Sequence, residues 1–321
     1  MNNTRRKFIK KIGKSGAYCL TSSFLVSCIN SASTSSQENT KKSKYKISLA
    51  QWSLHSALFS KEISNLDFPR VTREKFGIEA VEYVSQFFQD KAKDNAYLKE
   101  LKNIADNEGV KNVLIMVDKE GSLASTDTKE RMEAVENHYK WVDAAKEIGC
   151  ESIRVNLHGH GGEDEWLEGS IEGLAKLVEY GAANELNILV ENHGQWSSKG
   201  VLVKQVMDQI DSPWCGTLPD FGNFCVRRRD GDLWVSPCIE TYDMYKGIEE
   251  MMPYAKGVSA KTFAFDEQGN ETTIDFDRMM KIVNDSGYDG YIGVEYEGGT
   301  VDEDTGVKLT KALIERSIAN L

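Results

Sequence analysis

"SIRVNLHG" (residues 152–159) and "NILVENHG" (187–194) are two short apolar runs, and each ends in polar residues and a glycine. Between them, "SIEGLAKLVEYGAANEL" (170–186) places apolar residues at helical spacing and ends near an asparagine, as a helix stop does. The stretch therefore predicts strand, helix, strand, which is the repeating unit of a parallel sheet.

The same pattern continues in both directions along the chain. Further apolar runs are "YKISLAQW" (45–52), "GIEAVEYV" (77–84), "NVLIMV" (112–117), "CGTLPDFG" (215–222), "AKGVSAKTFAF" (255–265) and "YIGVEYEG" (291–298). Amphipathic segments separate them, such as "NAYLKELKNIADNEG" (95–109), "KERMEAVENHYKWVDAAKEIG" (129–149) and "DFDRMMKIVNDSG" (275–287). Eight such repeats over residues 45–321 predict a single-domain α/β fold, a (β/α)8 TIM barrel. A doubly wound sheet is the alternative, but "LAQWSLHSALF" (49–59) has no glycine for a phosphate loop.

The first 44 residues differ from this pattern. "NTRRKFIKKIGKSG" (3–16) has six basic and no acidic residues, and the apolar stretch after it is too short to span a bilayer. "TRRKFIK" (4–10) resembles a twin-arginine signal and "LVSC" (25–28) resembles a lipobox. We expect an export signal at 1–27, a lipid on Cys28, and a Ser/Thr-rich tether over 28–44. The protein would then be a membrane-anchored lipoprotein facing the periplasm or the cell exterior. A basic arm before an incidental apolar run is the alternative.

The charge of the folded part narrows the choice of partners. The whole chain has a net charge of −11, and removal of the six basic residues in 1–27 gives −11 − 6 = −17. Such an acidic surface argues against nucleic acid as the main partner. Among the remaining cysteines, Cys225 and Cys238 flank one loop and could pair, but plain buried thiols are the more frequent outcome.

Acidic residues follow three of the predicted strands. Glu191, Asp220 and Glu295 lie at corresponding ends of strands five, six and eight, where a closed barrel points side chains toward one spot. Converging like charges need a cation or a shared proton, and oxygen ligands favour Mg²⁺, Mn²⁺ or a similar ion. Each carboxylate taken alone is as well explained as a solvated loop residue or a helix cap.

Basic and imidazole groups lie near the same predicted strand ends. Lys261 lies within the apolar strand "GVSAKTFAF" (257–265), where a buried ammonium requires acidic partners unless it reaches solvent at the strand end. His193 shares the strand parity of Glu191, although a histidine bonded to backbone is equally compatible. His158 lies in a glycine-rich stretch that suits a substrate-contacting loop.

Three segments carry a resemblance to a known family: "ILVENHG" (188–194), "GTLPDFGNF" (216–224) and residues 257–298. From about Lys46 to the end, the chain resembles the xylose isomerase-like TIM barrels, which include sugar phosphate isomerases and epimerases. The resemblance implies a divalent ion (Mn²⁺, Mg²⁺, Co²⁺ or Zn²⁺) held by Glu, Asp, His and Glu at the ends of strands five to eight. The positions that match are Glu191, Asp220 and Glu295, but the expected histidine, in a pattern like "VHLKD", is replaced by Ser259 in "VSAKT".

The resemblance implies a metal-dependent sugar isomerase or epimerase that moves a proton next to a carbonyl through an enediolate. Glu191, Glu295 and Lys261 are the expected catalytic residues. The expected substrate contacts are Asn156, His158, His193, Asn223 and Trp52. A keto-glycoside lyase or hydratase using the same site, or a non-catalytic sugar-binding lipoprotein, are the alternatives. Dimers are common for this fold, so a homodimer is one expected assembly of this protein.

Overall fold

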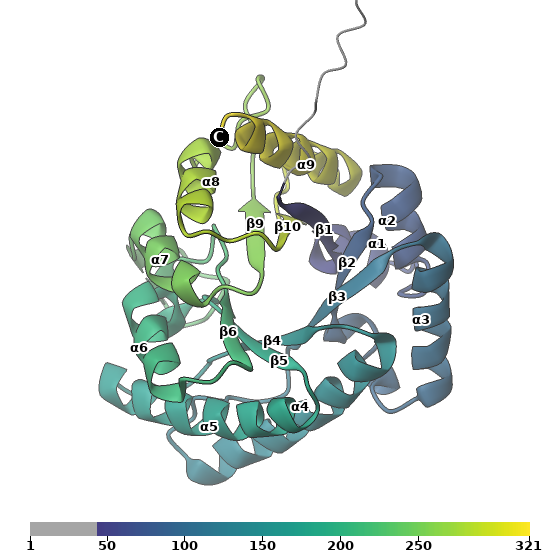
Figure 1. Cartoon of the computed structure of the whole chain (residues 1–321). Helices are drawn as coiled ribbons and strands as arrows, with labels where there is room; N and C mark the ends of the chain where they lie inside the picture. Colours follow the sequence, from purple (N-terminus) through teal and green to yellow (C-terminus); the bar gives the residue numbers. More distant parts are fainter. Residues whose placement is uncertain (1–43) are drawn as a thin grey trace, which may run out of the picture. The chain divides into compact units, whose positions relative to one another are not determined.

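The computed structural model describes residues 44–321, and these form the predicted barrel (Figure 1). Eight parallel strands form one sheet, in the order β6-β5-β4-β3-β2-β1-β10-β9. The strands are β1 (Lys46–Ala50), β2 (Ala80–Val84), β3 (Lys111–Met116), β4 (Ser152–Asn156), β5 (Asn187–Glu191), β6 (Cys215–Leu218), β9 (Val258–Thr262) and β10 (Tyr291–Tyr296). Except for Lys44, the predicted export signal and tether lie outside the described residues.

The two outer strands of this sheet, β6 and β9, meet through a short seam. Bridges join Thr217 to Ala255 and Asp220 to Ser259. The backbone N–H of Ser259 donates to Pro219 O at 2.9 Å, and that of Phe221 donates to Ser259 O at 3.1 Å. The sheet therefore closes on itself, as the predicted TIM barrel requires.

Helices form the outer ring in Figure 1. They are α1 (His55–Phe59), α2 (Phe68–Phe76), α3 (Asn95–Glu108), α4 (Thr128–Ile148), α5 (Glu163–Ala183), α6 (Gly200–Ile210), α7 (Met244–Met251), α8 (Phe276–Asp285) and α9 (Glu303–Ala319). Residues 44–321 also form the 3-10 turns η1 (Gln51–Leu54), η2 (Ser85–Phe87), η3 (Gln89–Lys91), η4 (Gln195–Ser198) and η5 (Met252–Tyr254). No helix in the described part of the chain has the length and apolar character to cross a membrane.

Local sequence explains where many helices begin and end. The carboxylates of Asp94, Asp127 and Asp275 accept hydrogen bonds from the first turns of α3, α4 and α8. Gly109 and Gly149 end α3 and α4 in the left-handed conformation, with φ of 66° and 79°. These caps fix the lengths of the helices that cover the barrel.

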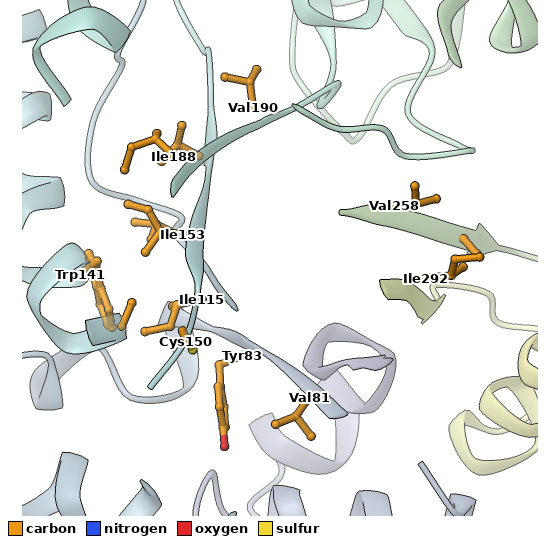
Figure 2. Packing of buried hydrophobic residues seen from close by; sticks show 14 of the residues in the cluster. Val81, Tyr83, Ile115, Trp141, Cys150, Ile153, Ile188, Val190, Val258 and Ile292 are labelled. Atoms are coloured by element: carbon orange, nitrogen blue, oxygen red, sulfur yellow. The ribbon is translucent and has the colours of Figure 1, made fainter. Parts of the chain in front are cut away.

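Strand alternation divides the apolar core into two layers. Residues such as Ile115, Ile153 and Val258 lie in the large layer that also contains helix side chains, among them Trp141 of α4 (Figure 2). The opposite strand faces form a smaller apolar layer inside the barrel: Ala50, Ala80, Val84, Val113, Leu114, Met116, Leu189 and Leu218. Because successive strand residues face opposite sides, Ser259 and Lys261 on β9 face the interior when Val258 and Ala260 face the helices.

A hairpin between β6 and α7 interrupts the barrel pattern. It consists of antiparallel strands β7 (Cys225–Arg228) and β8 (Cys238–Thr241). A disulfide joins Cys225 to Cys238, whereas Cys150 and Cys215 are buried free thiols. The more frequent outcome expected from sequence, four plain thiols, is therefore wrong for the pair that flanks the hairpin.

Gly173 in α5 lies directly against the loop that contains Leu123. A Cβ added there would lie 2.1 Å from the carbonyl oxygen of Leu123. In an open helix, Gly to Ala stabilises by about 0.5–1 kcal/mol. Here we expect Gly173→Ala to lower the free energy of unfolding by about 1–3 kcal/mol, because the backbone contact forces displacement. Urea denaturation measures it, with Gly299→Ala as control because a Cβ there meets no atom within 4 Å. A more stable Gly173→Ala would contradict the packing described.

Candidate active site

Three carboxylates from different strands meet inside the barrel mouth. Glu191 is the last residue of β5, Asp220 follows β6, and Glu295 lies in β10. One oxygen of each lies within 4.8 Å of the others, and the residues are 1%, 0% and 4% exposed. The structure thus brings together the three predicted ligands. Because all three are buried, the alternative that they are solvated loop residues does not hold.

Ser259 replaces the expected histidine and bridges two of these carboxylates. Its Oγ lies 2.7 Å from Asp220 Oδ2 and 2.5 Å from Glu295 Oε2. A hydroxyl has one proton, so it cannot donate to both oxygens, and the second contact needs a proton on one carboxyl group. Burial raises the pKa of Asp220 to about 6, although Lys261 opposes the shift. The pair therefore needs a proton or another cation to be stable.

Lys261 neutralises one side of the cluster. Its Nζ lies 3.0 Å from Glu297 Oε2, 3.3 Å from Glu295 Oε1 and 3.6 Å from Asp220 Oδ2. Burial alone would lower the pKa of Lys261, but the carboxylates, Asp220 first, raise it well above its ordinary value. The side chain is buried, so the alternative of a lysine reaching solvent at the strand end does not hold.

Arg154 neutralises the other side, and sequence reasoning missed it. Its Nε lies 2.9 Å from Glu191 Oε2, and its Nη1 donates to Asp118 Oδ1 at 2.8 Å. Burial raises the pKa of Glu191 well above its ordinary value even against this guanidinium. A signal was present, because Arg154 has the parity of Asn156 in β4 and Asp118 directly follows the run 112–117. Arg154 lies inside the apolar run "SIRVNLHG" as Lys261 lies inside its own, so a buried guanidinium there likewise requires acidic partners.

The charges of the site do not balance within the chain. Two cations, Arg154 and Lys261, contact five carboxylates, an excess of three negative charges when all are ionised: Asp118, Glu191, Asp220, Glu295 and Glu297. Oxygens within 4.8 Å of one another fit the coordination sphere of a divalent ion with oxygen ligands at 2.0–2.6 Å. The residues present therefore fit a divalent ion of the Mg²⁺ or Mn²⁺ type, even without the histidine.

A pocket of about 860 Å³ opens above this cluster. All the predicted site residues line it except Glu191 and Asp220, which lie directly behind its wall: the lining ones are Trp52, Asn156, His158, His193, Asn223, Lys261 and Glu295. Its volume falls in the range of small-molecule sites. Glu297 and Arg154 also line the pocket.

Several predicted substrate contacts already have partners in the protein. Asn223 donates from Nδ2 to Glu191 Oε1 at 3.3 Å and accepts from Lys261 Nζ at 3.3 Å, so it orients both groups. Asn156 donates to Asp118 at 2.8 Å, and Trp52 donates from Nε1 to Glu297 at 3.1 Å. Trp52 lines the pocket, and its indole stacks on the ring of His55.

Two of the three histidines that line the pocket, His158 and His193, lie side by side. Their rings are 5.6 Å apart, and His158 Nε2 lies 3.1 Å from the carbonyl oxygen of His193. Burial lowers the pKa of both, and Arg154 lowers that of His193 further. Nδ1 of His193 is buried and has no hydrogen-bond partner among the described residues.

The β7–β8 hairpin forms part of the pocket wall, through Cys225, Arg228, Leu233 and Trp234. A disulfide closing a loop of this size disfavours the open chain by about 3 kcal/mol.

We expect reduction with dithiothreitol to speed tryptic cleavage after Arg227, Arg228 or Arg229 by at least about tenfold, because the hairpin opens more often. Mass spectrometry of the fragments measures the cleavage rate. The control is the Cys225→Ser/Cys238→Ser variant, which should be cleaved fast with and without dithiothreitol. Equal rates before and after reduction would show that the disulfide does not hold the hairpin.

Comparisons with known proteins agree with this architecture. None of the curated proteins compared with the chain matches it. Among solved structures, an L-ribulose 3-epimerase has a TM-score of 0.64 at 16% identity, over 86% of this chain and 95% of that one. The 3-keto-D-glucoside 4-epimerase of E. coli has a TM-score of 0.59 at 13% identity, over 85% and 99%.

A third solved structure is a xylose isomerase-like TIM barrel protein from Mycobacterium smegmatis in complex with magnesium. Its TM-score is 0.61 at 12% identity, over 86% of this chain and 97% of that one. At these identities the likenesses show the fold. The family model for the xylose isomerase-like TIM barrel matches residues 73–317, which is most of the chain. The protein therefore belongs to the xylose isomerase-like TIM barrel family.

Proposed function

We propose that the protein is a divalent-metal-dependent sugar isomerase or epimerase that transfers a proton at the carbon next to a carbonyl. The observation that carries the proposal is the convergence of Glu191, Asp220 and Glu295 within 4.8 Å at the wall of a small-molecule pocket. The neighbours named as L-ribulose 3-epimerase and 3-keto-D-glucoside 4-epimerase support a keto-sugar as substrate.

Glu191, Asp220 and Glu295 would hold the ion, which when bound polarises the substrate's oxygens and lowers the cost of an enediolate. The excess of negative charge around them supports this role, as does the magnesium complex of the relative from Mycobacterium smegmatis. Asn223, which lines the pocket, holds Glu191 in place through its hydrogen bond to Glu191 Oε1.

The chain's own residues account for proton transfer. Glu295 lines the pocket, so its carboxylate can take a proton from a carbon held there. Glu191 lies behind the pocket wall and would serve the opposite side of the substrate only after the side chains that cover it shift. Lys261 also lines the pocket, and its ammonium stabilises negative charge that develops on a substrate oxygen. Return of the proton to the other face gives an epimer, and return to the neighbouring carbon gives an isomer.

Deuterium exchange tests the proposal without knowledge of the final product. D-fructose, D-tagatose, L-ribulose and a 3-keto-glucoside are incubated with the protein in D₂O, and the carbon-bound hydrogen next to the carbonyl is followed by NMR. We expect exchange with at least one sugar, loss of exchange in EDTA, and recovery with Mn²⁺, Mg²⁺, Co²⁺ or Zn²⁺. Exchange followed by loss of a β-substituent would show the lyase alternative. Sugar binding that is insensitive to EDTA, without exchange, would show a non-catalytic binding protein.

Export and lipid anchoring form a separate part of the proposal, because residues 1–27 and Cys28 lie outside the described residues. The mature chain would begin at Cys28 and be anchored to a membrane that faces the periplasm or the cell exterior. Mass spectrometry of the N-terminal peptide tests it. A diacylglyceryl-modified Cys28 is expected, absent in Cys28→Ala, and an unprocessed Met1 peptide in the membrane fraction would contradict it.

A further inference from the structure

We infer that Trp234 is a stacking platform for a second sugar ring, so that the substrate is a glycoside or disaccharide rather than a free monosaccharide. The inference rests on the proposed function in one respect, that the ring undergoing reaction lies beside Glu295. It concerns the part of the pocket that the β7–β8 hairpin adds to the barrel.

Trp234 lies in the wall of the same pocket as the reacting groups. Its ring centre is 4.5 Å from that of His193 and 6.4 Å from that of His158. A Cβ on Gly194 would lie 3.5 Å from the Trp234 ring, so one edge of the indole rests on the loop after β5. The residue is nevertheless 45% exposed, which leaves much of the ring uncovered. An indole supported on one side and open on the other is suited to receive a flat apolar ligand face.

The hairpin holds this indole in place. The Cys225–Cys238 disulfide closes its base. Arg228 donates to the carbonyl oxygens of Leu233 at 2.8 Å and Ser236 at 2.7 Å. The Asp232 carboxylate accepts the backbone N–H of Trp234 at 2.9 Å. Because these contacts are made within the hairpin, the platform is ordered before a ligand arrives, which lowers the entropy cost of binding.

The size and polarity of the pocket favour more than one ring. Its volume of about 860 Å³ is near the top of the range for small-molecule sites. Beyond the carboxylates, the lining includes Lys119 and Ser122, which are exposed or half-buried and can bond sugar hydroxyls. The indole N–H of Trp234 has no hydrogen-bond partner among the described residues, so it too is free to donate to a hydroxyl. Apolar stacking flanked by hydroxyl-bonding groups is the chemistry that recognises a pyranose.

The test compares binding of D-fructose with binding of disaccharides that contain it. Isothermal titration calorimetry measures Kd for D-fructose, isomaltulose, turanose and lactulose in the presence of Mn²⁺. The variants are Trp234→Ala and Trp234→Phe, with Val235→Ala as matched control. Val235 is the next residue, is 91% exposed and does not line the pocket.

We expect at least one disaccharide to bind wild type more tightly than its ketose does. Trp234→Ala should raise the Kd of that disaccharide roughly 3- to 10-fold and leave the Kd of the ketose within about 2-fold, since one aromatic stack contributes that much. Trp234→Phe should recover most of the affinity, and Val235→Ala should behave as wild type. Equal losses for ketose and disaccharide, no effect of Trp234→Ala, or the absence of any disaccharide binding would each overturn the inference.

The binding test is independent of turnover. If the disaccharide preference depends on Trp234 but no sugar exchanges deuterium, the proposed catalytic function fails and the platform stands. If exchange occurs and Trp234→Ala affects ketose and disaccharide equally, the platform fails and the catalytic function stands.

Discussion

Glu295→Gln is expected to reduce turnover by about 1,000-fold or more. Glutamine keeps the shape of the side chain but can neither accept a proton as a base nor offer an anionic oxygen to a cation, and general acid–base catalysis alone contributes about 10²–10⁴-fold. The side chain lines the pocket and contacts both Ser259 and Lys261. It is therefore expected both to transfer the proton and to hold the cation. Steady-state kinetics or deuterium exchange on the best keto-sugar measures the loss.

The control for this variant is another buried glutamate. Glu271 is 7% exposed, accepts hydrogen bonds from Thr273 and from the backbone of the same turn, and does not line the site pocket. Glu271→Gln should retain activity within about threefold, and near-UV circular dichroism should show both variants folded. A Glu295→Gln protein that keeps more than a tenth of wild-type activity would remove Glu295 from the mechanism.

Lys261→Met is expected to have the largest effect on stability, lowering the free energy of unfolding by about 3–5 kcal/mol in EDTA. Methionine removes the ammonium that lies within 3.6 Å of Asp220, Glu295 and Glu297 and leaves buried carboxylates uncompensated. Urea denaturation measures the change. Excess Mn²⁺ should restore more stability to this variant than to wild type, because the ion supplies the missing positive charge.

Lys281→Met is the matched control for Lys261→Met. Lys281 pairs with Asp285 on the outer face of α8, and its side chain is 69% exposed. Exposed pairs of this kind contribute about 0.3–0.5 kcal/mol, so the variant should be nearly as stable as wild type. If Lys261→Met unfolded at the same urea concentration as this control, the ammonium would not be needed to neutralise the cluster.

The parts of the molecule that sequence predicted are those with a repeated physical cause. Eight apolar runs separated by amphipathic segments specify the barrel. The rule that parallel strands share one carboxyl edge places Glu191, Asp220 and Glu295 together before any coordinates are known. Strand parity also explains why Lys261 lies inside.

The parts that sequence did not predict depend on single contacts. Arg154 was not predicted, although its charge interrupts an apolar run just as that of Lys261 does; it lies at the centre of β4, away from the strand end where site residues were expected. The hairpin was missed because its strands have four residues each, too short for an alternation pattern to be recognised. Pairing of Cys225 with Cys238 depends on that hairpin, and the exposure of Trp234 depends on both.

The seam between β6 and β9 couples ligand binding at the site to closure of the barrel, because the same residues take part in both. Asp220 and Ser259 form one of the two bridges that close the sheet, and Ser259 also contacts Glu295 on the neighbouring strand. A cation bound by these carboxylates would therefore link the two strands that close the barrel. Opening of this seam exposes the backbone amides of Phe221 and Ser259 to solvent exchange, so the rate of that exchange reports whether the site is filled.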